Sequence, residues 1–96
     1  MELDVWDLAF DDRNREHMHA NGISIRVDLE VVDGVPRAMP NHSKGGAQVL
    51  LVGPTSIGMV TLPIDPTDEY GVWRPRTGYP SKPADEVRYD KLGKKR

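Results

Sequence analysis

The chain has 96 residues, a formal net charge of −2 and no cysteine. A chain of this length buries one core, so we expect a single domain over residues 1–96. The lack of cysteine excludes a disulfide framework and a thiolate metal site. The longest apolar stretch, Val49 to Val52, is far too short to cross a bilayer, and the acidic N-terminus does not resemble a signal peptide, so we expect a cytoplasmic protein.

The charges are distributed unevenly along the chain. Residues 1–30 carry a net charge of −5, whereas residues 65–96 carry +2 and end in a basic stretch. Clustered Lys and Arg side chains attract a phosphate backbone, so only the second half of the chain is suited to binding RNA. The basic stretch at residues 93–96 is in itself typical of a frayed, solubilising tail.

The N-terminal part predicts an extended segment followed by a helix. Residues 3–10 alternate loosely between apolar and polar side chains, which favours an opening strand or arm. Asp11 and Asp12 supply a cap and a negative first turn for a helix that ends near Asn21, before Gly22. The stripe expected to be buried on this helix is unusually polar, which indicates a site or an interface, and it comprises Asn14, His17, Met18 and Asn21. We assign His17 and Met18 to a partner interface.

A second helix is predicted between Ser24, which can cap it, and Asp33. The β-branched residues of this stretch leave a strand as an alternative. Two prolines and two glycines then favour an irregular loop over residues 35–46. This loop carries Arg37, His42 and Lys44.

The remainder predicts a sheet and a closing helix. Residues 47–53 and 59–64 form the expected hairpin, and residues 72–79 form a third strand that Pro75 either breaks or restricts to an edge. Residues 83–92 predict a short helix. The fold class is therefore α+β, with a small antiparallel sheet, two N-terminal helices or a helix and a strand, and a C-terminal helix. The predicted core comprises Val49, Leu51, Val60, Leu62 and Ile64, covered by Trp6, Met18 and Leu29.

Arg74 and Arg76 are the first candidates for chemistry. Same-face residues two apart in a strand lie about 6.6 Å apart, so both guanidinium groups could grip one phosphate. Strict alternation directs Tyr79 to the opposite face unless Pro75 or Gly78 breaks it. The alternative is a charged strand face that prevents self-association.

The loop residues His42, Lys44 and Arg37 could add a proton-transfer group and further positive charge. No spacing rule connects the three, and a surface histidine usually has no such role. His17 and His19 are two residues apart and therefore cannot both bind one metal ion from a helix. Because the sequence also lacks a glycine-rich phosphate loop, we expect neither a metal nor a cofactor.

Three stretches resemble the BrnT-like branch of the RelE-type ribonuclease toxins. Residues 10–24 resemble the family's opening helix, with Asn14, His17 and Gly22-Ile23 as the best matches. Residues 50–55 and 71–80 resemble two of its strands, and an acidic residue and Tyr89 follow in the last helix. Asn21 stands where the family has a histidine, and Tyr79 stands where it has an arginine late in the third strand.

The resemblance implies a RelE-like fold, metal-independent endoribonuclease activity and a cognate antitoxin that covers the cleft, in a bacterial or phage protein. It implies that Arg and Lys side chains stabilise the cyclising phosphate. We assign catalysis to Arg74, Arg76, His42 and Tyr79, and RNA binding to Arg37, Lys44 and Arg88. The acidic N-terminal half leaves an alternative open, a catalytically silent protein that acts by binding a host or cognate protein, with a homodimer as a further option.

Overall fold

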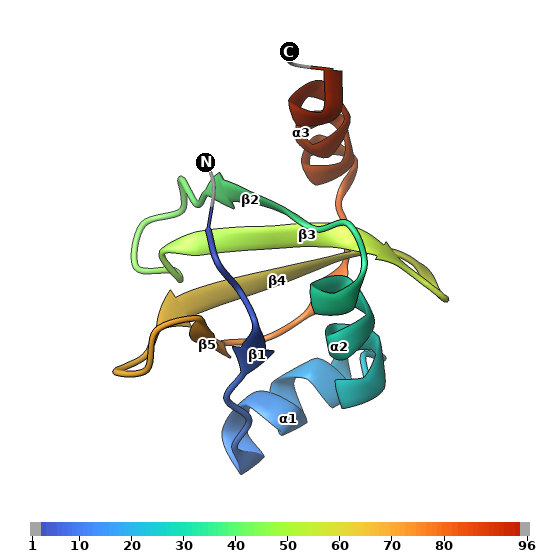
Figure 1. Cartoon of the computed structure of the whole chain (residues 1–96). Helices are drawn as coiled ribbons and strands as arrows, with labels where there is room; N and C mark the ends of the chain where they lie inside the picture. The colour runs from blue at the N-terminus through green and yellow to red at the C-terminus, as the bar shows by residue number, and fades with distance from the viewer. Residues whose placement is uncertain (1–2, 95–96) are drawn as a thin grey trace.

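The computed structural model describes residues 3–94, which form one α+β fold (Figure 1). Among these residues, no helix has the length and apolar character needed to cross a membrane. The elements follow one another in the order β1 (Asp7–Leu8), α1 (Asp12–Ala20), α2 (Ile25–Asp33), β2 (Arg37–Pro40), β3 (Val49–Thr55), β4 (Gly58–Pro66), β5 (Val72–Pro75), β6 (Tyr79–Pro80) and α3 (Pro83–Lys94).

The strands form one sheet in the order β1-β5-β4-β3-β2, with β6 paired to β4 further along the same edge as β5. The hairpin of β3 and β4 is its centre and confirms the predicted pairing of these two segments. All pairings are antiparallel except that of β1, which runs parallel to β5. The α+β class is therefore confirmed, whereas the expectation of a purely antiparallel sheet is wrong.

Apolar side chains cover both faces of the sheet. On one face, Val49 and Leu51 of β3 pack with Val60, Leu62 and Ile64 of β4 beneath the N-terminal helices. On the other, Leu50 and Val52 pack with Met39 and with Tyr89 of α3. Figure 1 shows α1, α2 and the N-terminal arm in front of the sheet, and α3 standing at one end of it. We call the face covered by α1 and α2 the helical face, and the opposite face, against which Tyr89 of α3 packs, the α3 face.

The two N-terminal helices begin where their caps predict. Asp11 Oδ1 accepts a hydrogen bond from the backbone N–H of Asn14 at 2.8 Å, and Asn14 Oδ1 accepts one from the backbone N–H of Asp11 at 3.0 Å. Ser24 Oγ accepts the N–H of Val27 at 3.3 Å. The second segment forms a helix, in which Ser24 satisfies a backbone donor that the first turn leaves free, and the alternative of a strand is wrong.

The predicted core is confirmed for its five strand residues and for Met18, which is 1% exposed. Two of the covering residues were wrongly predicted, since Trp6 is 66% and Leu29 is 36% exposed. In their place Val27, Val31, Ile23 and Leu8 cover the helical face.

Three boundaries differ from the sequence prediction. The supposed loop over residues 35–46 contains β2, so Arg37 lies on a strand. The predicted third strand is broken at Pro75, which confirms one of the two alternatives: β5 ends there and residues 79–80 pair separately as β6, while β5 itself lies between β4 and β1 and is not an edge strand. Helix α3 continues through Gly93 to Lys94, which places the start of the predicted frayed tail in a helix; residues 95–96 lie outside the described residues.

Candidate functional site

A one-residue bulge between β5 and β6 determines which of their side chains lie on the α3 face. Arg74 lies opposite Asp65 in the β4–β5 pairing, and Tyr79 lies opposite Thr61 in the β4–β6 pairing. The three residues 76–78 therefore span only two residues of β4. Directly opposed residues share a sheet face, and Thr61 and Asp65 are on the same face because they are four residues apart. Arg74 and Tyr79 consequently lie on one face, which strict alternation would not allow.

Both candidate arginines are paired with carboxylates. Nη1 of Arg74 donates to Oδ2 of Asp11 at 2.7 Å, and Nε of Arg76 donates to Oδ2 of Asp65 at 2.5 Å. All four side chains are at least partly exposed, so these pairs exchange readily with solvent and contribute little to stability. The two guanidinium groups thus have different partners and do not form a ready-made clamp.

Arg76 also ties down the loop between β2 and β3. Its Nη1 donates to the backbone carbonyl of Gly45 at 3.0 Å, and the other carboxylate oxygen of Asp65 accepts the N–H of Gln48 at 2.9 Å. The exposed residues His42 and Lys44 lie in this loop. The structure therefore attaches the loop carrying them to Arg76, without any hydrogen bond from His42 or Lys44 themselves to the arginines.

Tyr79 lies in a polar corner between the sheet and the start of α3. The Lys82 ammonium lies 5.2 Å from the centre of the Tyr79 ring. Burial, reinforced by the negative charge of Asp85, raises the pKa of the Tyr79 phenol. The side chain of Tyr79 is half-buried and remains protonated at neutral pH, so it can donate a hydrogen bond or a proton.

The base of this corner is a buried network. Thr61 Oγ1 donates to Oδ2 of Asp85 at 3.0 Å and lies 2.8 Å from Oγ of Ser81, which must then donate to Thr61. Because Thr61 is fully buried and Asp85 nearly so, the network fixes the start of α3 against β4. Sequence reasoning missed these residues and Lys82, since their proximity depends on the bulge.

Arg37 and Arg88 hold α3 against β2. The Arg37 guanidinium lies 4.0 Å from the centre of the Tyr89 ring and donates to the Tyr89 carbonyl at 2.7 Å. Arg88 donates to the carbonyl of Pro40 at 2.9 Å. The two expected RNA ligands therefore form structural contacts at this junction and lie apart from the pairs formed by Arg74 and Arg76.

The two residues of α1 that we assigned to a partner interface differ in their exposure. His17 is exposed, but Met18 is part of the core and is not available to a partner. Asn14, also buried, caps the helix, and exposed Asn21 donates to the carbonyl of Gly78 at 2.9 Å. Of the polar stripe expected on α1, Asn14 thus caps the helix and Asn21 supports the bulge.

One buried acid has no hydrogen-bonding partner. Asp28 of α2 is fully buried, and neither of its carboxylate oxygens accepts a hydrogen bond. A Cβ at Gly78 would lie 3.4 Å from Oδ1 of Asp28 and 2.8 Å from Leu62, so Asp28 points toward the bulge. Burial raises the pKa of Asp28 to about 7.

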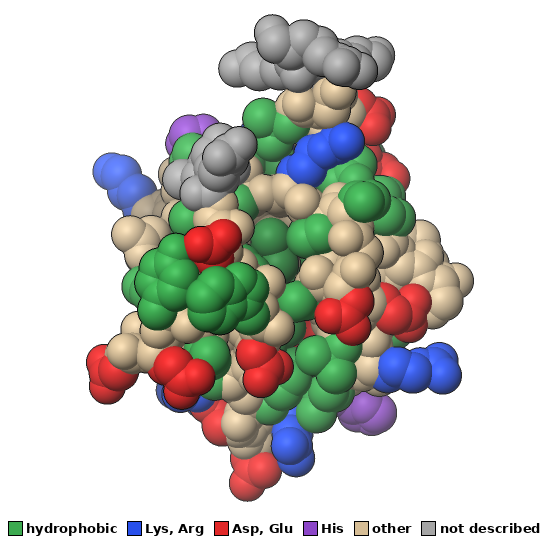
Figure 2. All heavy atoms as spheres, in the orientation of Figure 1, with side chains coloured by type: hydrophobic (Ala, Val, Ile, Leu, Met, Phe, Trp, Pro, Cys, Tyr) green, Lys and Arg blue, Asp and Glu red, His purple; other side chains and the backbone are tan. Residues whose placement is uncertain are grey.

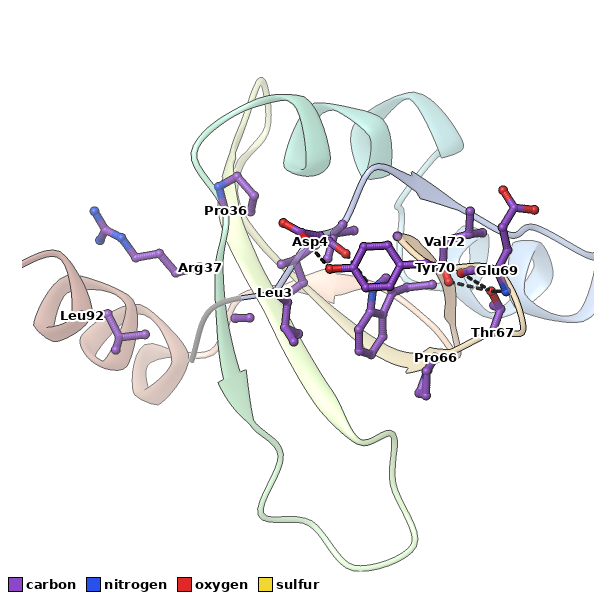
Figure 3. Close-up of a pocket in the computed structure, with 15 residues that line it drawn as sticks. Leu3, Asp4, Pro36, Arg37, Pro66, Thr67, Glu69, Tyr70, Val72 and Leu92 are labelled. Carbon is purple, nitrogen blue, oxygen red and sulfur yellow. Dashed lines mark hydrogen bonds between the residues drawn. The ribbon is translucent and has the colours of Figure 1, made fainter.

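A groove lies on the helical face, between the N-terminal arm and β2, and was not foreseen (Figure 3). Its volume is about 890 Å³. Residues from the arm, from β2 to β5, from the turn before β5 and from α3 line it, among them Val5, Ala38, Leu51, Tyr70 and Leu92. No motif marks it, because it forms where segments distant in sequence meet.

The described residues contain no group of three or more His, Asp or Glu side chains arranged to hold a metal ion. Comparisons with protein-family models, with curated proteins and with solved structures found no match to this chain.

Proposed function

We propose that the chain is an endoribonuclease toxin that cleaves RNA by transesterification on its α3 face, using Arg74, Arg76, Tyr79 and His42. The observation that carries this proposal is the bulge at residues 76–78, which places Tyr79 on the same face as Arg74. Transesterification needs cations for the phosphate and a group that donates a proton to the leaving oxygen. Both types of group are present on this face.

The residues divide the chemistry as follows. Arg74 and Arg76 exchange their carboxylate partners for phosphate oxygens, and Lys82 adds positive charge beside Tyr79. The 2′-hydroxyl attacks phosphorus and loses its proton to His42, on the loop that Arg76 holds. As the bond from phosphorus to the 5′-oxygen breaks, Tyr79 protonates that oxygen, and the raised pKa of its phenol keeps the proton available until then. Lys44 contributes to RNA binding at the rim, and in this proposal an antitoxin covers the face.

The ion pairs favour a second candidate, a catalytically silent protein that works by binding another protein. Asp11 and Asp65 neutralise both arginines in the free chain, and this lowers the attraction of the face for RNA. Such paired, exposed charges are common at the rims of protein interfaces.

RNA cleavage and filter binding at several salt concentrations separate the two candidates. The test variant is Arg74→Ala/Arg76→Ala, and the matched control is Arg13→Ala/Arg15→Ala, which removes the same charge at the same spacing from exposed positions of α1. We expect the first variant to lose cleavage and the control to retain it. If the wild-type protein neither binds nor cuts RNA at low salt, the enzyme proposal fails and the protein-binding candidate replaces it.

A further inference from the structure

We propose that the groove on the helical face binds a basic, apolar peptide segment of a partner protein. The residues that line the groove include none of Arg74, Arg76, Tyr79 and His42, so this inference does not depend on the proposed RNA cleavage. It rests on three features: an apolar floor, an exposed aromatic pair held in place beside it, and an excess of carboxylates around it.

The floor is apolar and reaches the core. Val5 of the arm, Ala38 of β2 and Leu51 of β3 line the groove and also belong to, or pack against, the core of the helical face. Figure 3 shows Leu3, Asp4 and Tyr70 in the middle of the lining, with Pro36, Arg37 and Leu92 toward one end and Thr67 and Glu69 toward the other. A volume of 890 Å³ is large enough for several side chains of a peptide.

Two large, exposed aromatic side chains pack together beside the groove: Tyr70 lines it, and Trp6 contacts Tyr70. Trp6 is 66% and Tyr70 is 71% exposed, and their rings pack edge to face with centres 5.3 Å apart. The Tyr70 hydroxyl donates to the Asp4 carboxylate, and Trp73 Nε1 donates to the Asp4 carbonyl at 3.1 Å. Tyr and Trp are the residues that most often anchor protein interfaces, and a fixed orientation lowers the entropic cost of binding.

The charges around the groove select a basic partner. Asp4 and Glu69 line it, and Glu30 and Asp33 line a second hollow beside Pro54. Among the described residues that line the two hollows, Arg37 is the one cation, and its guanidinium is directed to Tyr89. Figure 2 shows acidic side chains at several points around a hydrophobic patch on this side of the molecule. Such a field attracts Lys and Arg and repels nucleic acids and anionic lipids.

The partner is recognised through its side chains rather than by adding a strand. The neighbouring edge strand β2 has four residues, follows Pro36 and ends in Pro40, so it offers few free backbone donors to an incoming strand. The occupant is therefore a segment with apolar side chains for the floor and with Lys or Arg beside them.

Three synthetic peptides of equal length probe the groove: one of alternating leucine and lysine, one of leucine and glutamate, and one of serine and lysine. Binding is followed by the NMR signals of the Trp6 indole and of the Ala38 and Gly71 amides. We expect only the leucine–lysine peptide to shift these signals. Glu69→Lys should weaken its binding by about tenfold, whereas the control Glu16→Lys, an equal charge change on α1, should leave it within about twofold.

Several results would overturn the inference. These are failure of the leucine–lysine peptide to shift the Trp6 signal, equal binding of the leucine–glutamate peptide, or equal weakening by the two charge reversals. A Trp6 signal that moves with protein concentration in the absence of peptide would assign the groove to a second copy of the chain instead. Since none of these measurements involves RNA, failure of the groove proposal leaves the nuclease proposal unaffected.

Discussion

Asp65 lies directly opposite Arg74 in the sheet, yet its carboxylate accepts a hydrogen bond from Arg76, while Arg74 reaches Asp11. Asp65 also accepts the backbone N–H of Gln48. One carboxylate therefore holds a candidate phosphate ligand and the neighbouring loop at the same time, and an RNA phosphate would have to compete with it for Arg76.

Replacing Asp65 by asparagine should strengthen RNA binding. The amide oxygen can still accept the N–H of Gln48, but the charge that occupies Arg76 is lost, so we expect affinity at low salt to rise about three- to tenfold and the salt dependence to steepen. Filter binding measures both quantities. Asp68→Asn, an exposed acid in the following turn, is the control, and an equal gain in that variant would show that only net charge matters.

Replacing Leu51 by alanine should destabilise the fold by about 2 to 5 kcal/mol, because it leaves a cavity within the core of the helical face. Urea unfolding followed by circular dichroism gives the free energy. Leu29→Ala removes the same atoms from a side chain that is 36% exposed and should cost less than about 1 kcal/mol. A cost near zero for the Leu51 variant would mean that the core is misassigned.

Asp28 should make the protein less stable as the pH rises. The pKa of Asp28 is about 7 in the folded chain and near its ordinary value of 3.8 in the unfolded chain, so the folded state holds the proton more tightly. The contribution of Asp28 to the free energy of unfolding is therefore largest below pH 3.8. On the order of 4 kcal/mol of this free energy is lost as the pH rises to about 7.

Asp28→Asn should remove this dependence and should be more stable than the wild-type protein at pH 8. Unfolding free energies at pH 4.5, 6 and 8 measure the effect, with Asp33→Asn on the exposed end of the same helix as the control. Identical pH profiles for the wild-type protein and the Asp28 variant would count against a buried, unpaired carboxyl.

Gly71→Ala should displace Trp6 as well as strain the backbone. Gly71 has φ +82°, and an added Cβ would approach the Trp6 ring within 2.4 Å. We expect a loss of about 2 kcal/mol or more, together with a changed Trp6 NMR signal. Gly22→Ala is the matched control, because φ there is +78° and the added Cβ would meet nothing within 4 Å. Equal losses in both variants would show that the backbone alone accounts for the cost.

Sequence predicted those parts of the fold that depend on near neighbours. Asp11 and Ser24 cap their helices through residues three positions away, so both helices were correctly placed. The strand β2 was missed, because its four residues become a strand only by pairing with β3. Trp6 was misplaced because its exposure depends on its packing against Tyr70 and Gly71, which are far away in the sequence.

The candidate site was predictable only in part for the same reason. Arg74 and Arg76 were found from their type and spacing, but their carboxylate partners, Asp11 and Asp65, follow from the sheet order. The position of Tyr79 depends on how many residues separate β5 from β6, and no pattern in the sequence reports that the pairing shifts there.

The bulge makes the length of this segment matter more than its composition. Residues 76–78 supply one residue more than β4 requires, so deletion of one of them would remove the bulge and leave Tyr79 opposite Thr61, in regular alternation with Arg74. Loss of the bulge without a deletion would instead bring Gly78 opposite Thr61 and turn Tyr79 toward the helices. A substitution at Thr77 leaves this phase unchanged. In natural variants of this chain, we therefore expect either three residues with a bulge or two without one between Pro75 and Tyr79, since both lengths keep Tyr79 on the face of Arg74.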